Sequence, residues 1–116
     1  MKKTKEIILD TSLELFNSLG LSKVTLRTIA NKMEISQGNL NYHFKKREDI
    51  IETLYFQLVQ NIDSSISSMK EPKNPFQLLV SISQTIMSNF YEYRFFFLIL
   101  FKLCVKIKRL ELIIQS

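Results

Sequence analysis

A run of polar side chains followed directly by a run of cations occupies residues 37 to 47. The hydrogen-bonding groups of this run are Gln37, Asn39, Asn41, Tyr42 and His43. At helical spacing most of them fall on the side opposite Leu40 and Phe44, which predicts a short helix with one apolar and one large polar face. The cations Lys45, Lys46 and Arg47 come next. A polar helix face beside cations is suited to binding a polyanion.

The distribution of charge favours the same segment. Residues 1–47 hold nine Lys and Arg against four Asp and Glu, and residues 48–116 hold seven of each, so the net charge of +5 arises entirely in the first part. A basic balance alone fits nucleic acid or an anionic membrane surface, but its confinement to one segment marks that segment as the polyanion-facing one.

Helical periodicity and capping residues predict the elements that position this segment. Apolar positions from Ile8 to Leu19 predict a first helix, ended by Gly20 in left-handed geometry. Thr25 is placed to cap a second helix that ends near Met33. After a tight connection, Ser36 is placed to cap the third helix, which runs from Gln37 to about His43.

The rest of the chain also reads as helical. An apolar stripe from Ile50 to Ile62 predicts a long fourth helix, ended by a linker of Ser64–Ser68 with Pro72 and Pro75. A fifth helix is expected from Phe76 and a sixth from near Arg94. From Leu98 onward, apolar and basic residues alternate without a clean helical face. The expected fold is all-α: a three-helix head, a long connecting helix and part of a helical second domain.

Two short helices joined by a three- or four-residue turn, the second polar-faced and flanked by cations, fit the major groove of B-DNA, which is about 12 Å wide. The first helix and the start of the fourth would hold them in place. The expected core is Ile8, Phe16, Ile29, Ile35, Leu40 and Phe44.

Other classes of function lack the residues they need. One His, a single Cys and no Gly-rich phosphate loop leave nothing from which to build a catalytic, metal or cofactor site, so neither an enzyme nor a cofactor is expected. Cys104 is expected to be a small buried apolar residue in a reducing cytoplasm. The apolar run 95–101 is far shorter than the ~20 residues that span a bilayer, and no secretory signal is expected at the start. A surface-bound membrane protein would need an exposed apolar face at residues 95–105.

Three segments together resemble the DNA-binding signature of the TetR/AcrR family of transcriptional regulators. They are Val24–Ala30, Ile35–Leu40 and Tyr42–Ile50, and the resemblance covers about residues 7 to 55. It implies a helix-turn-helix DNA-binding domain over residues 1–47, and a connecting helix with part of a helical regulatory domain over residues 48–116. It also implies a bacterial, cytoplasmic, nucleoid-associated repressor that binds palindromic DNA as a homodimer and releases it when a small ligand binds.

The resemblance implies a role for each matching residue. Contacts to phosphates, which set the register of the protein on DNA, fall to Thr25, Arg27, Thr28, Tyr42, His43 and Lys46. Base edges would be approached by Gln37, Gly38, Asn39 and Asn41, and Ser36 is counted in the same DNA-binding set. Asn and Gln can each pair with adenine at about 1–3 kcal/mol of discrimination.

Plainer interpretations stay open for these residues. Tyr42 and His43 are consistent with a packed aromatic and a solvated or capping histidine. Lys45–Arg47 is consistent with a solvated charge run. Phe76, Phe90, Tyr93 and Phe97 would line a ligand pocket by the resemblance, but an aromatic stripe at helical spacing is more often plain core.

The chain stops before the helices through which the family dimerises, which predicts a C-terminally truncated regulator, with a frameshift as one hypothesis for the irregular end. Two functions are therefore carried forward. One is a ligand-responsive repressor, and the other is a truncated remnant with weak, non-specific DNA binding.

Overall fold

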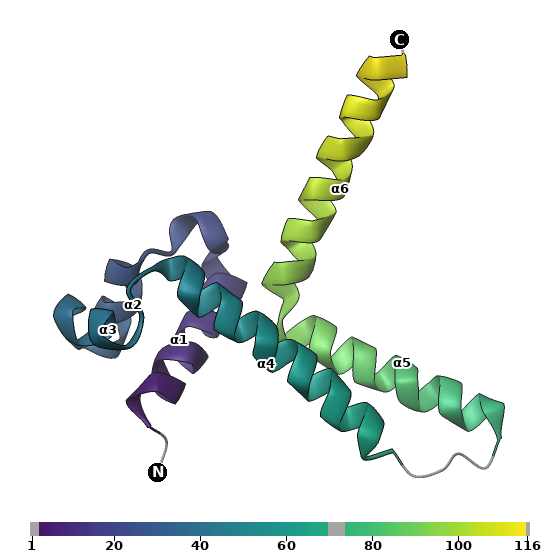
Figure 1. Ribbon diagram of the computed structural model, residues 1–116, viewed down its shortest axis with the longest axis horizontal. Coiled ribbons are helices and arrows are strands. Elements are labelled where there is room, and N and C mark those ends of the chain that lie inside the picture. Colours follow the sequence, from purple (N-terminus) through teal and green to yellow (C-terminus); the bar gives the residue numbers. More distant parts are fainter. Residues whose placement is uncertain (1–2, 70–73, 116) are drawn as a thin grey trace.

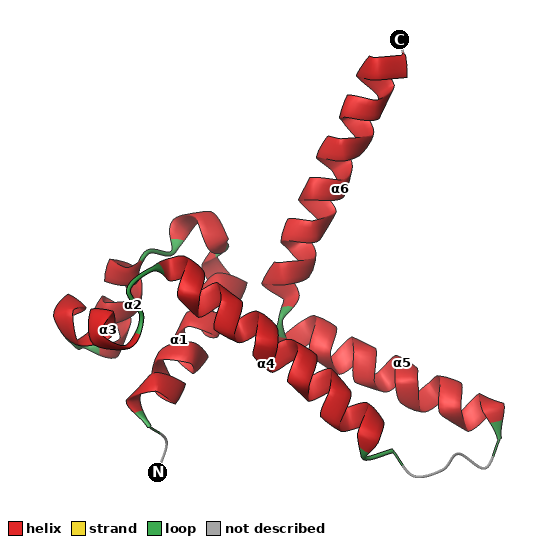
Figure 2. Cartoon of the chain, viewed as in Figure 1, coloured by secondary structure: helices red, strands yellow, loops and turns green. Residues whose placement is uncertain are grey.

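The structure, a computed structural model, describes residues 3–69 and 74–115. Within these ranges the chain is helical, without a strand, which confirms the predicted all-α class (Figures 1 and 2). The elements are α1 (Thr4–Leu19), the 3₁₀ turn η1 (Leu21–Lys23), α2 (Leu26–Met33), α3 (Gln37–His43), α4 (Arg47–Ser67), α5 (Pro75–Glu92) and α6 (Arg94–Gln115).

Helices α1 to α3 and the first turns of α4 enclose one apolar core. The predicted core residues Ile8, Phe16, Ile29, Leu40 and Phe44 are buried, and Ile35 packs against them at the edge. Val24, Ile50 and Leu54 are buried with them. Each fully buried side chain of this size contributes about 1.5–3 kcal/mol, so the head has its own source of stability.

Two features of α1 and α4 differ from expectation. Gly20 has a φ of 89° but a ψ of 152°, so it leaves α1 in an extended conformation with positive φ rather than in left-handed helical geometry. This conformation favours glycine and turns the chain into η1. Helix α4 continues through Ser64 to Ser67, so the first four residues of the predicted linker are helical. Pro72 lies outside the described residues.

Helix α5 begins where its cap residues predict. Asn74 accepts a hydrogen bond at Oδ1 from the backbone N–H of Gln77, at 2.9 Å, and Pro75 is the first residue of the helix. Proline suits this position because its missing N–H would have no partner inside the helix. Helix α5 then packs alongside α4 (Figure 1).

Helix α6 projects from the body as a single arm (Figure 1). Its irregular sequence resolves into two apolar stripes, one through Phe96, Leu103 and Leu110 and one through Leu98, Val105 and Leu112. The two series are offset by two residues, which puts them on nearly opposite sides of a helix. All residues from 100 to 115 are exposed, including Cys104, so the expectation of a buried cysteine is wrong.

The corner between α5 and α6 is fastened to α1. Asn17 donates from Nδ2 to the carbonyl oxygen of Glu92 at 2.8 Å, and its Oδ1 accepts from the N–H of Phe95 at 3.1 Å. The rings of Phe16 and Phe95 pack with their centroids 5.1 Å apart. This contact sets where α6 leaves the head.

Hydropathy along the described helices identifies none that combines the length and the apolar character needed to cross a membrane.

Candidate nucleic-acid interface

Helices α2 and α3 are joined by a tight turn. Glu34 adopts left-handed geometry with φ 59° and ψ 39°, and the N–H of Ile35 donates to the carbonyl oxygen of Ala30 at 3.1 Å. The turn therefore closes over three residues, Glu34 to Ser36, and Ile35 anchors it to the core. This is the predicted helix-turn-helix arrangement.

Both helices begin at the predicted cap residues. The Thr28 N–H donates to Thr25 Oγ1 at 3.2 Å, and the Thr25 N–H donates to Thr28 Oγ1 at 3.3 Å, which forms a reciprocal capping box. At the start of α3 the Asn39 N–H donates to Ser36 Oγ at 3.1 Å. Thr25, Thr28 and Ser36 thus have structural roles that are independent of any ligand.

The outer face of α3 is free for contacts. Leu40 is fully buried, while Gln37, Gly38, Asn39 and Asn41 are exposed. Tyr42 is 84% exposed, so it is not the packed aromatic of the plainer interpretation. Its ring meets the half-buried ring of His43 edge-on, with centroids 5.2 Å apart.

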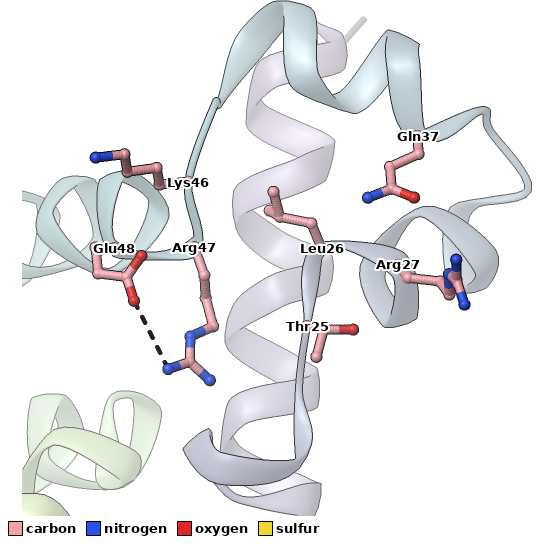
Figure 3. A pocket seen from close by; sticks show the side chains of 7 residues that line it. All are labelled: Thr25, Leu26, Arg27, Gln37, Lys46, Arg47 and Glu48. Carbon is pink, nitrogen blue, oxygen red and sulfur yellow. Dashed lines mark ion pairs between the residues drawn. The ribbon is translucent and has the colours of Figure 1, made fainter.

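A basic hollow of about 590 Å³ opens beside this face. It is lined by Thr25, Leu26, Arg27, Gln37, Lys46, Arg47 and Glu48. Figure 3 shows Gln37 and Arg27 on the side of the hollow opposite Lys46 and Glu48. Four residues of the predicted DNA-binding set, Thr25, Arg27, Gln37 and Lys46, are thus brought together, whereas Asn41, Tyr42 and His43 lie at the other end of α3.

The electrostatics of the basic hollow favour an anion. Its lining includes the first residues of α2, α3 and α4, namely Leu26, Gln37 and Arg47, and unpaired N–H groups at helix starts attract negative charge. Three cations and one carboxylate line it. Among the described residues no group of His, Cys, Asp and Glu is placed to hold a metal ion. The side chains here can form hydrogen bonds to anionic oxygens and to the polar edges of heterocyclic rings.

One cation of this site has a role that the sequence did not suggest. The guanidinium of Arg47 points back toward the segment before α2 and donates to two backbone carbonyl oxygens (Figure 3). In the sequence Arg47 is simply the third member of a charge run. Its partners lie 23 and 26 residues away along the chain, so no local sequence pattern indicates these contacts.

Of the four residues predicted to line a ligand pocket, Phe90 and Phe97 come together, whereas Phe76 and Tyr93 lie elsewhere. Phe90 and Phe97 pack with centroids 4.4 Å apart and line a hollow of about 430 Å³ with Arg94, Leu98 and Phe101. Phe76 lies at the opposite end of α5 and is 72% exposed.

Tyr93 is buried at the corner between α5 and α6, where its hydroxyl accepts from Asn61 Nδ2 at 3.1 Å. Burial raises the pKa of the Tyr93 hydroxyl, and the Glu92 carboxylate adds to the rise, while the Asn61 hydrogen bond opposes it. Tyr93 is therefore a packed, hydrogen-bonded residue that does not line the hollow beside Phe90.

The fold and the exposed face of α3 define a helix-turn-helix protein. Residues 8–54 match the family described as bacterial regulatory proteins, tetR family. The chain therefore carries the N-terminal helix-turn-helix domain of the TetR family, as its sequence signature predicted.

Similar proteins support this assignment. A crystal structure of a TetR-family transcriptional regulator from Marinobacter aquaeolei VT8 superimposes with a TM-score of 0.79 and 31% identity, over 95% of this chain and 54% of that one. The probable HTH-type transcriptional regulator YttP of Bacillus subtilis is 27% identical over 68% of this chain and 42% of its own length. The tetracycline repressor protein class C of Escherichia coli is 32% identical over 46% of this chain and 24% of its own. The chain thus spans about half or less of the length of these relatives.

Proposed function

We propose that this chain binds double-stranded DNA through α2 and α3 and regulates transcription. The observation that carries the proposal is the exposed polar face of α3 beside the basic hollow. A helix with its side chains is about 10–12 Å across, which matches the major groove of about 12 Å. The basic excess of residues 1–47 supplies the attraction to phosphates.

Roles within the interface follow from position. Thr25, Arg27, Thr28 and Lys46 would meet phosphates on one side of the groove, and Tyr42 and His43 would meet them at the far end of α3. Gln37, Asn39 and Asn41 would contact base edges. Phosphate contacts set register and base contacts set sequence preference.

We extend the proposal to repression in the cytoplasm, by a homodimer on a palindromic operator that a small ligand releases. Support comes from the family and from the hollow beside Phe90 and Phe97, which is apolar apart from Arg94. A reporter gene placed behind the DNA that lies upstream of the gene encoding this chain, called the upstream DNA below, tests the direction of regulation. Lower expression in the presence of the chain supports repression, and higher expression points to activation. Light scattering at micromolar concentration tests the dimer.

DNA binding is tested by fluorescence anisotropy on the chain's own upstream DNA and on a scrambled duplex, across a salt series. Lys46→Ala is compared with Lys106→Ala, which removes the same charge from the exposed part of α6. We expect preference for the upstream DNA, and a slope of log affinity against log salt that is smaller by about one for Lys46→Ala only.

Two other results have defined meanings. Equal, weak and salt-sensitive binding to both duplexes would favour the alternative function, a remnant that no longer recognises an operator. No binding to either duplex at low salt would contradict the proposal.

A further inference from the structure

Arg47 is the first residue of α4, and its side chain is directed into the protein. Nη1 donates to the carbonyl oxygen of Leu21 at 2.9 Å and to that of Val24 at 3.1 Å. Nη2 lies 3.7 Å from Glu48 Oε1, and the side chain is 31% exposed. Arg47 thus connects the start of α4 to a segment more than twenty residues earlier.

The two carbonyl groups belong to the connection between α1 and α2. Leu21 opens η1, and Val24 is the fully buried residue directly before Thr25, the cap of α2. The Leu21 carbonyl oxygen also accepts from the Val24 N–H at 3.4 Å, so Arg47 adds a charged donor to a backbone hydrogen bond already present in this connection. Hydrogen bonds from a cation are stronger than those between neutral groups, so this pair of contacts is well suited to fix the connection.

Both edges of the basic hollow are adjacent to these contacts in sequence. Lys46 precedes Arg47 by one residue on the α4 side, and Thr25 follows Val24 by one residue on the α2 side. Arg47 also lines the hollow of about 460 Å³ between η1 and the base of α6, together with Phe95 and Lys102. Its guanidinium therefore lies where the start of α2, the start of α4 and the base of α6 meet.

We infer that Arg47 is a positioning residue that sets the spacing between the α2 start and the α4 start, so that Thr25 and Lys46 reach the same stretch of DNA backbone. Arg47 itself does not neutralise a phosphate in this arrangement. The inference rests on the proposed function, because the spacing matters only if both edges contact DNA.

The test uses Arg47→Lys and Arg47→Gln in the full chain, with Arg109→Lys on α6 as the matched control. Arg47→Lys keeps the charge but replaces the planar, multi-donor group by a flexible ammonium. We expect affinity for the upstream DNA to fall on the order of tenfold for Arg47→Lys, comparable to the loss of one specific contact. The salt slope should equal that of the unaltered chain for Arg47→Lys and for Arg47→Gln.

A positioning role also predicts coupling. Lys46→Ala should weaken binding by a smaller factor in an Arg47→Lys background than in the unaltered chain, because the misplaced Lys46 has less to lose. If Arg47 acted on folding alone, Lys46→Ala would weaken binding by the same factor in both backgrounds. The comparison is made after circular dichroism shows that both proteins are folded at the assay temperature. If Arg47→Gln fails to fold, Arg47→Lys carries the whole comparison.

Two outcomes would overturn the inference. One is unchanged affinity for Arg47→Lys. The other is a salt slope that falls by about one for Arg47→Gln, since that would make Arg47 a phosphate contact. Equal binding of both duplexes by the unaltered chain would instead favour the alternative function, and absence of binding would contradict the proposed function; this result is read before any variant is compared.

Discussion

Gly38 is the residue whose identity the folded chain explains least. It is the second residue of α3, and a Cβ built on it would meet no atom within 4 Å. Glycine inside a helix costs about 1 kcal/mol relative to alanine. No neighbour within 4 Å requires its small size, and the proposed approach of DNA to α3 would explain it.

Gly38→Ala should therefore stabilise the free chain by about 0.5–1 kcal/mol in urea unfolding. It should also weaken binding to the upstream DNA in anisotropy, because the new methyl group lies on the exposed side of α3. Gly20→Ala is the matched control. Its φ of 89° makes alanine unfavourable, so that variant should lose stability. A Gly38→Ala chain that binds DNA as tightly as the unaltered chain would argue against α3 entering the groove.

The corner between α5 and α6 depends on hydrogen bonds that cross between distant elements. Asn17 of α1 contacts Glu92 and Phe95, and Asn61 of α4 contacts Tyr93. The hydrogen bonds to Tyr93 and Phe95 are partly buried, whereas the one to the Glu92 carbonyl is exposed. Contacts from α1 and α4 thus hold the orientation of α6.

Asn17→Ala should destabilise the corner by about 1–3 kcal/mol, because the Glu92 carbonyl and the Phe95 N–H both lose their partner. Urea unfolding measures the change. Ser18→Ala, which removes an exposed hydroxyl bonded within its own helix, is the control and should cost much less. Equal effects of the two variants would show that the Asn17 contacts contribute nothing to stability.

Tyr93 gives the corner a dependence on alkaline pH. Its pKa is raised above the ordinary 10.0 by burial and by Glu92, so the folded chain keeps the proton to a higher pH than the unfolded chain. The stabilisation is complete below pH 10 and is lost as pH rises beyond it. Tyr93→Phe should remove this part of the alkaline loss in thermal unfolding, at the expense of about 0.5–1.5 kcal/mol at neutral pH for the hydrogen bond to Asn61. Tyr42→Phe, at an exposed site, should retain the alkaline loss, and an identical loss in Tyr93→Phe would contradict the assignment.

The whole molecule is a compact head with two extended parts. Its overall dimensions are 53 × 52 × 19 Å, because α4 and α5 extend one way and α6 another (Figure 1). Residues 100–115 of α6 are all exposed, including apolar side chains on both stripes. A helix stabilised mainly by its own backbone hydrogen bonds is marginal in water.

Hydrogen exchange should therefore separate these parts. Backbone N–H groups of the inner turns of α1 and of the first half of α4 should exchange slowly, and those of residues 101–115 should exchange fast. Mass spectrometry of peptides after exchange measures the contrast. Protection of residues 101–115 equal to that of α1 would mean that another surface covers α6 in solution.

The part of the fold that the sequence predicts best is the part set by local rules. Thr25, Ser36 and the apolar periodicity around Leu40 specify α2, the turn and α3 within a few residues of each other. The contacts of Asn17 and Arg47 join residues 23 to 78 positions apart, and no local pattern marks them. The α6 region shows the same limit: the ring of Phe96 packs against that of Tyr55, but all residues from 100 to 115 are exposed, so the apolar pattern there matches no packed face.

For the candidate site, the signature singled out Thr25, Arg27, Gln37 and Lys46, which the fold brings to one hollow, and their contacts with DNA stay a prediction. It could not predict that Arg47 turns inward while Lys46 stays exposed, since both are cations in one run. That difference depends on where the carbonyl groups of Leu21 and Val24 lie, which only the folded chain defines.

The central claim, that α3 and the starts of α2 and α4 form the DNA-contacting surface, is tested most directly by NMR titration of the ¹⁵N-labelled chain with its upstream duplex. We predict that the largest shifts of backbone N–H signals fall on residues 25–28, 36–43 and 45–47, while the signals of α5 and of residues 101–115 move little. Shifts concentrated on α5 or α6, with those of α3 unchanged, would contradict the claim.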